Sequence, residues 1–272
     1  MKAPRALVFN ADDFGFGAAE NAGVMRANAT GIVREASLGV TGPAFDRAAE
    51  LARDRRGSLG VGLHLSFTFG RALTGPIPHL TDADGRFLSL GHVLAATLLR
   101  RPPRARVRAE VRAQLERLDE AGIDPTHLNG HHHAHLLPVI RDAVLELLAE
   151  RPNLHVRVPR GAGRSPRGAF LSLLGRSFAL RARLGGVRLR SLPCYGLGQG
   201  RSELGALLAR MRLPAEWVVH PTTAAGAEHG GSGLGRGAEP GELAWLESPE
   251  LAELLQRWRV EPASYAELAT MR

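Results

Sequence analysis

The chain has 272 residues, of which 44% are hydrophobic, and its formal net charge of +8 is supplied almost wholly by arginine. This length and hydrophobic content are typical of one compact enzyme-sized domain over residues 1–272 and argue against a disordered chain. Cys194 is the only cysteine, which excludes an intramolecular disulfide and a thiolate cluster. Any bound metal must therefore be held by oxygen and imidazole ligands.

The basic charge suits nucleic acid, an anionic membrane surface or an acidic ligand. We expect no nucleic-acid partner, because no aromatic residues interleave with the arginine cluster at 100–108 and no zinc-finger or RNP-like motif is present. No leader-like segment and no apolar stretch of about 18 residues stands out. The sequence therefore predicts a cytoplasmic protein, with peripheral attachment at the inner membrane surface left open.

The first predicted strand covers residues 5–10 and is followed by two adjacent carboxylates, Asp12 and Asp13. Two such charges repel each other unless a cation or a proton separates them. Polar residues at the carboxyl ends of parallel strands commonly carry the chemistry of α/β proteins. The pair therefore indicates a cation site. The alternative is that these residues only cap the helix predicted to begin near Ala18.

Four later strand-like segments, at residues 58–63, 125–130, 154–159 and 216–219, also lead to ionisable side chains. A single histidine at a strand end is more often structural than a ligand. Repetition at the same topological position favours a shared site instead. The side chains concerned are His64, the run His131, His132, His133 and His135, the pair Arg157 and Arg160, and His220.

Helical patterns alternate with the strands and predict parallel strand–helix–strand units, hence an α/β fold. Arg112 and Glu116 are expected to pair one helical turn apart. The glycine-rich residues 222–241 lack apolar periodicity and are predicted to form a mobile loop. The helical patterns cover residues 18–29, 44–53, 90–99, 107–121, 136–149 and 251–257, and a further strand-like segment covers 32–40.

Four motifs in register resemble the YdjC-like carbohydrate deacetylases. The resemblance implies a deformed (β/α) barrel of the polysaccharide-deacetylase type, with the active site at the carboxyl ends of parallel strands. It also implies one divalent metal ion and the removal of N-acetyl groups from amino sugars. The motifs are Asn10-Ala-Asp-Asp-Phe-Gly15, Gly62-Leu-His-Leu65, Thr126-His-Leu-Asn-Gly-His-His-His-Ala-His135 and Val219-His-Pro221.

The resemblance also implies roles for individual residues. Asp13, His64 and His131 are the implied metal ligands, and one carboxylate with two imidazoles leaves positions open for water and substrate. Asp12 is the implied general base, and His220 is the candidate general acid unless it is only a structural histidine before a proline. The residues expected to line the pocket or contact these groups are Asn129, His133, His135, Arg157 and Arg160.

For the metal we expect Zn or Mg, while Fe, Co, Ni and Mn also suit this donor set. The Asn-Gly before the three histidines and the segment Phe69-Gly-Arg-Ala-Leu-Thr-Gly-Pro76 are most similar to the hopanoid-biosynthesis-associated branch, which implies an N-acetylglucosaminyl hopanoid lipid as substrate. Two other classes stay open, namely another metal-dependent hydrolase such as a phosphoesterase, and a non-catalytic sugar- or lipid-binding descendant. The oligomeric state, a homodimer included, also stays open.

Residues 168–185 combine apolar side chains at helical spacing with arginines. A basic amphipathic helix of this kind can lie in a membrane interface. The alternative is a helix packed on the barrel with its arginines in solvent. A lipid-linked substrate favours the membrane interpretation. The residues at helical spacing are Phe170, Leu171, Leu174, Phe178 and Arg181, and the arginines close to the apolar stripe are Arg176, Arg181 and Arg183.

Overall fold

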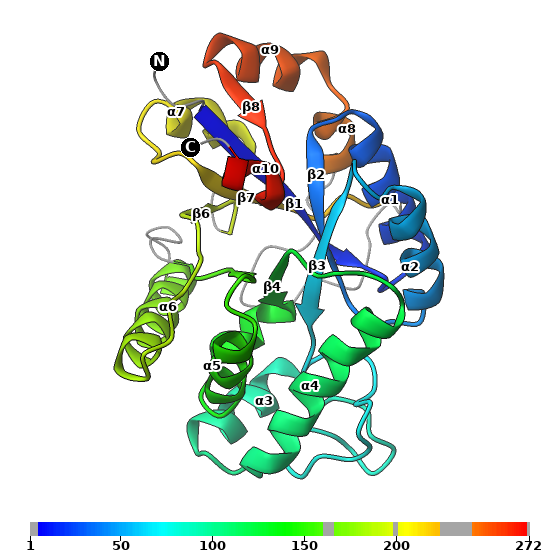
Figure 1. The fold of residues 1–272 in the computed structure, drawn as a ribbon, viewed down its shortest axis with the longest axis vertical. Coiled ribbons are helices and arrows are strands. Elements are labelled where there is room, and N and C mark those ends of the chain that lie inside the picture. The colour runs from blue at the N-terminus through cyan, green and yellow to red at the C-terminus, as the bar shows by residue number, and fades with distance from the viewer. Residues whose placement is uncertain (1–4, 160–165, 198–200, 224–240, 271–272) are drawn as a thin grey trace.

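The computed structural model describes residues 5–159, 166–197, 201–223 and 241–270. Arg160, a predicted pocket residue, lies outside the described residues. So do residues 224–240, which make up most of the predicted mobile loop. Parallel strands form a curled sheet that helices cover on its outer side, with α1 and α2 at one flank and α6 at the other (Figure 1). This is the α/β class that the alternation of strands and helices predicts.

The sheet has eight strands in the described part of the chain, in the order β5-β4-β3-β2-β1-β7-β6, with β8 also paired to β1. At one edge, the backbone N–H of Val156 donates to the carbonyl of Arg190 at 2.7 Å, just before β6 at the other edge. The sheet therefore curls into a deformed barrel, as predicted. The strands are β1 Arg5–Phe14, β2 Val33–Leu38, β3 Gly60–Leu65, β4 His127–Gly130, β5 His155–Val156, β6 Cys194–Tyr195, β7 Ala215–Val219 and β8 Val260–Pro262.

The helices agree with the predicted ones to within a few residues, except after the histidine run. There the chain forms a 3₁₀ segment, η1 (His131–Leu136), before α5 begins at Ile140. His132 and His133 have positive φ angles of 51° and 57°, which an α-helix does not accept. The α-helices are α1 Ala18–Ala29, α2 Phe45–Asp54, α3 Leu90–Leu98, α4 Arg104–Glu120, α5 Ile140–Glu150, α6 Pro166–Leu184, α7 Leu204–Leu208, α8 Glu242–Leu246, α9 Pro249–Arg257 and α10 Tyr265–Thr270, and η2 is Arg201–Glu203.

β1 is longer than predicted and carries both carboxylates within it. Its apolar residues Leu7 and Phe9 are fully buried, as expected for a central strand with neighbours on both sides. Asp13 has a φ of 64°, in the left-handed region that Asp tolerates better than most residues. This residue interrupts the alternation of side chains, and the register with β2 shifts between Ala11 and Phe14. Asp12 and Asp13 consequently reach the same site.

Ion pairs on the outside of the barrel join neighbouring helices. Arg112 of α4 pairs with Glu150 of α5, and its charge also interacts with that of Glu116, the predicted partner one turn along α4. Arg108 pairs in the same way with Glu146, at 2.6 Å. Because α4 and α5 pack side by side, these ion pairs join the two helices.

In the described ranges, no helix combines the length and the apolar character that crossing a bilayer requires.

Candidate metal centre and active site

Asp13, His64 and His131 meet at the carboxyl ends of β1, β3 and β4. One potential ligand atom from each lies within 4.8 Å of the others. The Oδ1 atom of Asp13 is 3.1 Å from both Nε2 of His64 and Nδ1 of His131. All three side chains are buried. The structure thus brings together the three residues that the resemblance implies as metal ligands.

The environment of His64 fits a metal ligand. Its Nδ1 atom lies 2.6 Å from Oδ1 of Asn129, to which it donates, so that Nε2 carries the lone pair. Within the described residues this buried Nε2 makes no hydrogen bond, although the Asp13 carboxylate is close. A cation between the two would satisfy both, and one carboxylate with two imidazoles is a suitable donor set for a divalent metal.

The electrostatics of the centre favour positive charge. Burial opposes the ionisation of Asp13, but His131 and His64 outweigh it and hold the pKa of this carboxyl well below its usual range. Burial also opposes the protonation of His64, yet Asp12 and Asp13 together raise its pKa. For His131, burial dominates and lowers the pKa. The two carboxylates therefore create a negative potential that would attract a divalent cation.

Asp12 lies beside this centre and is held by four donor contacts. Arg157 donates to both of its oxygens, at 2.5 and 2.8 Å. The side-chain amides of Asn10 and Asn129 each donate to Oδ1 at 3.1 Å. Burial alone would raise the pKa of Asp12, but the charge of Arg157 and its hydrogen bonds keep the pKa well below its usual value. Asp12 is thus an ionised carboxylate in a fixed orientation.

Arg157 joins two acids in the interior of the barrel. Besides Asp12 it contacts Oε1 of Glu216 on β7, through Nε at 2.8 Å and Nη2 at 2.6 Å. All three side chains are buried. A buried arginine is stable only when it is paired and hydrogen-bonded, and these two acids meet that need. The structure thus places Arg157 where it orients Asp12. Glu216 was not predicted as a site residue, because it stands at the start of a short apolar run.

His220 follows β7 and reaches the same centre. Its Nε2 atom lies 3.9 Å from Oδ2 of Asp12, and its side chain keeps 16% of its surface exposed. The backbone N–H of His220 donates to Oε2 of Glu242 at 2.6 Å, which fixes the segment after the strand. This position, close to Asp12 and partly open to solvent, suits a group that exchanges a proton with a substrate.

His133 and His135 lie in the buried wall of the site and outside the metal cluster. Nε2 of His135 donates to the carbonyl of Arg157 at 2.9 Å. Burial lowers the pKa of His135 to about 3, and it lowers that of His133 well below its usual value. Both side chains are therefore neutral at ordinary pH, and His135 supports the backbone that carries Arg157.

Two phenylalanines for which no role in the site was predicted form part of the wall. Phe16, in the turn after β1, lies with its ring centroid 4.9 Å from that of His131 and 5.5 Å from that of His64. Phe69, in the loop after β3, lies 4.3 Å from Phe16. Apolar rings beside a metal centre limit the access of water. The only sequence signal for Phe16 is its position directly after the Asp-Asp motif.

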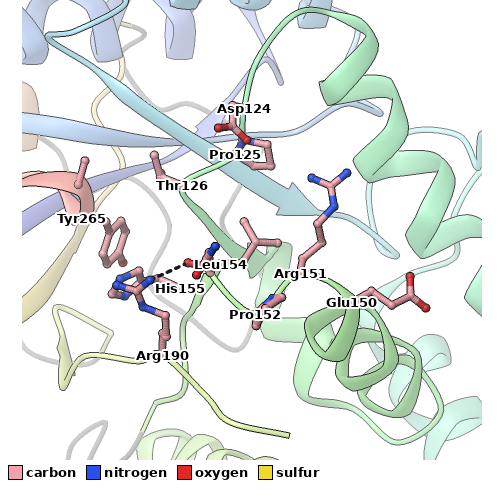
Figure 2. Close-up of a pocket in the computed structure, with 12 residues that line it drawn as sticks. Asp124, Pro125, Thr126, Glu150, Arg151, Pro152, Leu154, His155, Arg190 and Tyr265 are labelled. Atoms are coloured by element: carbon pink, nitrogen blue, oxygen red, sulfur yellow. Dashed lines mark hydrogen bonds between the residues drawn. The ribbon is translucent and has the colours of Figure 1, made fainter. Parts of the chain in front are cut away.

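A pocket of about 410 Å³ lies away from this centre, at the amino-terminal ends of β4 and β5 (Figure 2). Tyr265, His155 and Arg190 lie together on one side of it, and Arg151 and Glu150 lie on the other. None of the residues predicted for the active site lines this pocket. The candidate chemistry and the hollow in Figure 2 therefore occupy opposite ends of the sheet.

The fold and the site define a class of protein, namely a curled α/β barrel with an Asp–His–His centre and a buried carboxylate at the carboxyl ends of its strands. Within that class, the chain belongs to the YdjC-like protein family, whose sequence model matches residues 6–257.

Three relatives illustrate the similarity. A protein of Brevibacillus brevis named "Carbohydrate deacetylase" is 38% identical over 169 residues, which are 62% of this chain and 65% of that protein. A Mus musculus protein of the same name is 32% identical over 95% of this chain and 92% of its own length. A crystal structure from Enterococcus faecalis V583 has a TM-score of 0.74 at 22% identity and covers 98% of this chain and 99% of its own, which shows the shared fold. The match to the bacterial relative thus spans less than two thirds of its length.

Proposed function

We propose that this chain is a metal-dependent N-deacetylase that hydrolyses the acetamido group of an amino sugar. The observation that carries the proposal is the buried, ionised Asp12 directly beside the cluster of Asp13, His64 and His131. A metal-binding function alone needs no such base. The names of the curated relatives support the same reaction class.

The reaction joins water to the acetyl carbon and breaks the carbon–nitrogen bond, which yields acetate and a free amine. When bound by Asp13, His64 and His131, a divalent cation would polarise the acetyl carbonyl and acidify a water molecule. Asp12 accepts the proton of that water, while Arg157 keeps the carboxylate in place. His220 donates a proton to the amine as it leaves, and it lies 3.9 Å from the base.

The remaining residues serve binding and support. We propose that Asn129, His133 and His135 hold the ligands and the wall of the pocket, and that the basic pair of Arg157 and Arg160 orients the base and the sugar. The metal is Zn or Mg in this proposal, with Fe, Co, Ni and Mn as alternatives for the same donors. The whole chain then works as one catalytic domain.

We further propose a lipid-linked amino sugar, such as an N-acetylglucosaminyl hopanoid, as the substrate of a cytoplasmic enzyme that contacts the membrane peripherally. The support is a surface that we call the leucine surface. All exposed large hydrophobic side chains in the described residues lie on two helices, with Leu98 and Leu99 at the end of α3 and Leu173, Leu180 and Leu184 on α6.

The leucine surface replaces the apolar stripe predicted from the sequence. Leu171, Leu174 and Phe178 of that stripe are buried against the barrel, so the packed-helix interpretation is correct for them. The opposite side of α6 carries the exposed leucines and the exposed Arg176, Arg181 and Arg183.

Asp142 of α5 contacts an arginine from each of the two parts of the leucine surface. It is 3.5 Å from Arg100, which follows Leu99, and 3.7 Å from Arg181, which follows Leu180. Leucines surrounded by arginines match the apolar and anionic layers of a bilayer surface.

The test of the proposed reaction is a screen for acetate release over free and lipid-linked acetamido sugars, with added divalent metal and with a phosphate ester as comparison. We expect acetate from at least one acetamido sugar and no phosphate release. Phosphate release without acetate would instead identify a phosphoesterase. Tight sugar binding with neither product would identify a non-catalytic binding protein.

A further inference from the structure

We infer that Ser37 and His127, in a buried hydrogen-bond chain that begins at Glu35, are positioning residues for the metal centre. This inference rests on the proposed function, and it assigns roles to residues outside the ligand set. The chain determines which nitrogen of His64 faces the metal, and it holds Asp12 at the same time. Its members Glu35, Ser37, His127 and Asn129 are fully or almost fully buried.

Asn129 is the point at which the chain meets the centre. Its Oδ1 atom is 2.6 Å from Nδ1 of His64, while its Nδ2 atom donates to Asp12 at 3.1 Å and to Ser37 at 2.6 Å. The reverse orientation of this amide would place its oxygen against the Asp12 carboxylate. The amide orientation therefore requires the proton of His64 on Nδ1 and leaves the Nε2 lone pair for a metal.

Ser37 fixes the orientation of that amide. Its Oγ atom accepts hydrogen bonds from Asn10, at 2.8 Å, and from Asn129. With both lone pairs occupied by these amides, the hydroxyl proton of Ser37 is directed to Nε2 of His127, at 2.9 Å. Ser37 can act as a double acceptor only because His127 takes its proton.

His127 is in turn oriented from Glu35. The hydroxyl of Thr126 donates to Oε2 of Glu35 at 2.7 Å, so its oxygen accepts from Nδ1 of His127 at 2.9 Å. Both oxygens of Glu35 accept hydrogen bonds, Oε2 from the hydroxyl of Thr126 and Oε1 from the backbone N–H of Tyr265, and this acceptor end sets the direction of every bond that follows. Thr126 and Tyr265, whose backbone N–H also donates to Glu35, separate this end of the chain from the pocket in Figure 2.

Strand β3 leaves space for the side chains of this hydrogen-bond chain. Gly60, Gly62 and His64 occupy alternate positions on β3 and thus share one face. A Cβ atom on Gly60 would lie 2.4 Å from Oε1 of Glu35, and one on Gly62 would lie 2.4 Å from Nδ1 of His127. Apolar side chains could fill this interior at lower desolvation cost, so a fully bonded polar chain indicates a role beyond stability.

The test measures Zn²⁺ binding by competition with a chelator. It compares the purified full-length protein with two variants that interrupt the hydrogen-bond chain. Ser37→Ala removes the double acceptor, and Thr126→Val removes the bond to Glu35. The matched controls Ser172→Ala and Thr97→Val remove buried hydroxyls that donate to carbonyls of their own helices, each at 2.8 Å. A nitrogen-15 NMR spectrum of the histidines reports the tautomer of His64 directly.

We expect Ser37→Ala to weaken Zn²⁺ binding by about 10- to 100-fold, as losses beside metal ligands typically do, with a change in the His64 signal. Thr126→Val, a milder change at the far end, should shift both measurements in the same direction. The controls should stay within about twofold of the parent chain. Unchanged affinities in both test variants, or equal losses in the controls, would overturn the inference.

The proposed function can fail separately. Zn²⁺ binding without acetate release from any acetamido sugar would overturn the deacetylase proposal, while the inference is judged on the affinities and the His64 signal. Acetate release combined with unchanged affinities in Ser37→Ala and Thr126→Val would overturn the inference alone.

Discussion

The adjacent residues Asp12 and Asp13 lie in different environments within the site. Asp12 is bonded to Arg157 and to two side-chain amides, whereas Asp13 faces two imidazoles. The left-handed backbone at Asp13 allows both carboxylates to reach one site from a single strand. The environments thus separate the carboxylate suited to proton transfer from the carboxylate suited to a cation.

Substitutions at the two aspartates should therefore have different effects. Asp12→Asn keeps the shape and the Asp13 ligand, so we expect metal content to persist while turnover falls by about 10²–10⁴-fold. Asp13→Asn and His64→Ala should instead reduce metal content. Elemental analysis and acetate-release rates on the same samples measure both quantities. Retained activity in Asp12→Asn would refute its role as base, and equal metal loss in all three variants would make it a ligand.

His135 should make the fold sensitive to acid. Its pKa is about 3 in the folded protein because of burial, against about 6.5 in an unfolded chain. Between these values the unfolded chain binds a proton that the folded chain does not. Stability is therefore complete above about pH 6.5 and falls as the pH is lowered, by up to about 1.4 kcal/mol per pH unit for this residue.

His135→Gln offers an amide donor for the carbonyl of Arg157 but cannot be protonated. Urea unfolding from pH 7 to pH 4 should show a shallower loss of stability for this variant than for the parent chain. Identical slopes for the two proteins would show that His135 does not contribute to the acid sensitivity.

At the scale of elements, the sequence predicted the long helices and the strands that carry site residues. His127 and Asn129 occupy alternate positions of β4, and His131 directly follows the end of the strand at Gly130. The short strands β6 and β8 have two and three residues, too few for a periodic pattern. Glu35, Ser37 and Glu216 could not be predicted as site residues, because only the curl of the sheet brings them to their partners.

β3 should tolerate no side chain at Gly62. A Cβ atom there would lie 2.4 Å from the backbone oxygen of His127, which cannot rotate away. We expect Gly62→Ala to lower the free energy of unfolding by about 1–3 kcal/mol, the usual effect of overpacking. Gly91→Ala in α3 meets no atom within 4 Å and should be neutral or stabilising by up to about 1 kcal/mol. Urea denaturation of both variants tests the contrast, and equal effects would contradict it.

The leucine surface on α3 and α6 should bind anionic vesicles. Replacement of Leu180 and Leu184 by Ser should weaken sedimentation with phosphatidylglycerol vesicles, since the inserted apolar area is lost. Replacement of Arg176, Arg181 and Arg183 by Gln should remove the salt-sensitive part of the binding.

Arg47→Gln, on the exposed part of α2, is the matched control for the arginine changes and should bind as the parent does. An absence of vesicle binding at low salt would reject the membrane contact. Light scattering of the parent chain and the Leu180→Ser variant would then show whether the same surface joins two copies.

At the scale of the molecule, the curl of the sheet is what creates the site. Asp13, His64 and His131 are far apart in sequence, and only parallel strands that end at one mouth bring them within 4.8 Å. The interior of the same barrel holds Arg157 and the hydrogen-bond chain from Glu35, so Asp12 and the cluster of Asp13, His64 and His131 rest on one buried polar network. The motifs in the sequence predicted this cluster, while the supporting network became visible only in three dimensions.

The central claim is that one metal ion held by Asp13, His64 and His131 supports amide hydrolysis. The most direct test is to strip the chain with a chelator and to measure acetate release as Zn²⁺ or another divalent ion is added back. We expect no acetate without metal, a rate that rises in proportion to bound metal, and a break at one ion per chain. Full acetate release from the stripped chain, or a rate that does not follow the bound metal, would contradict it.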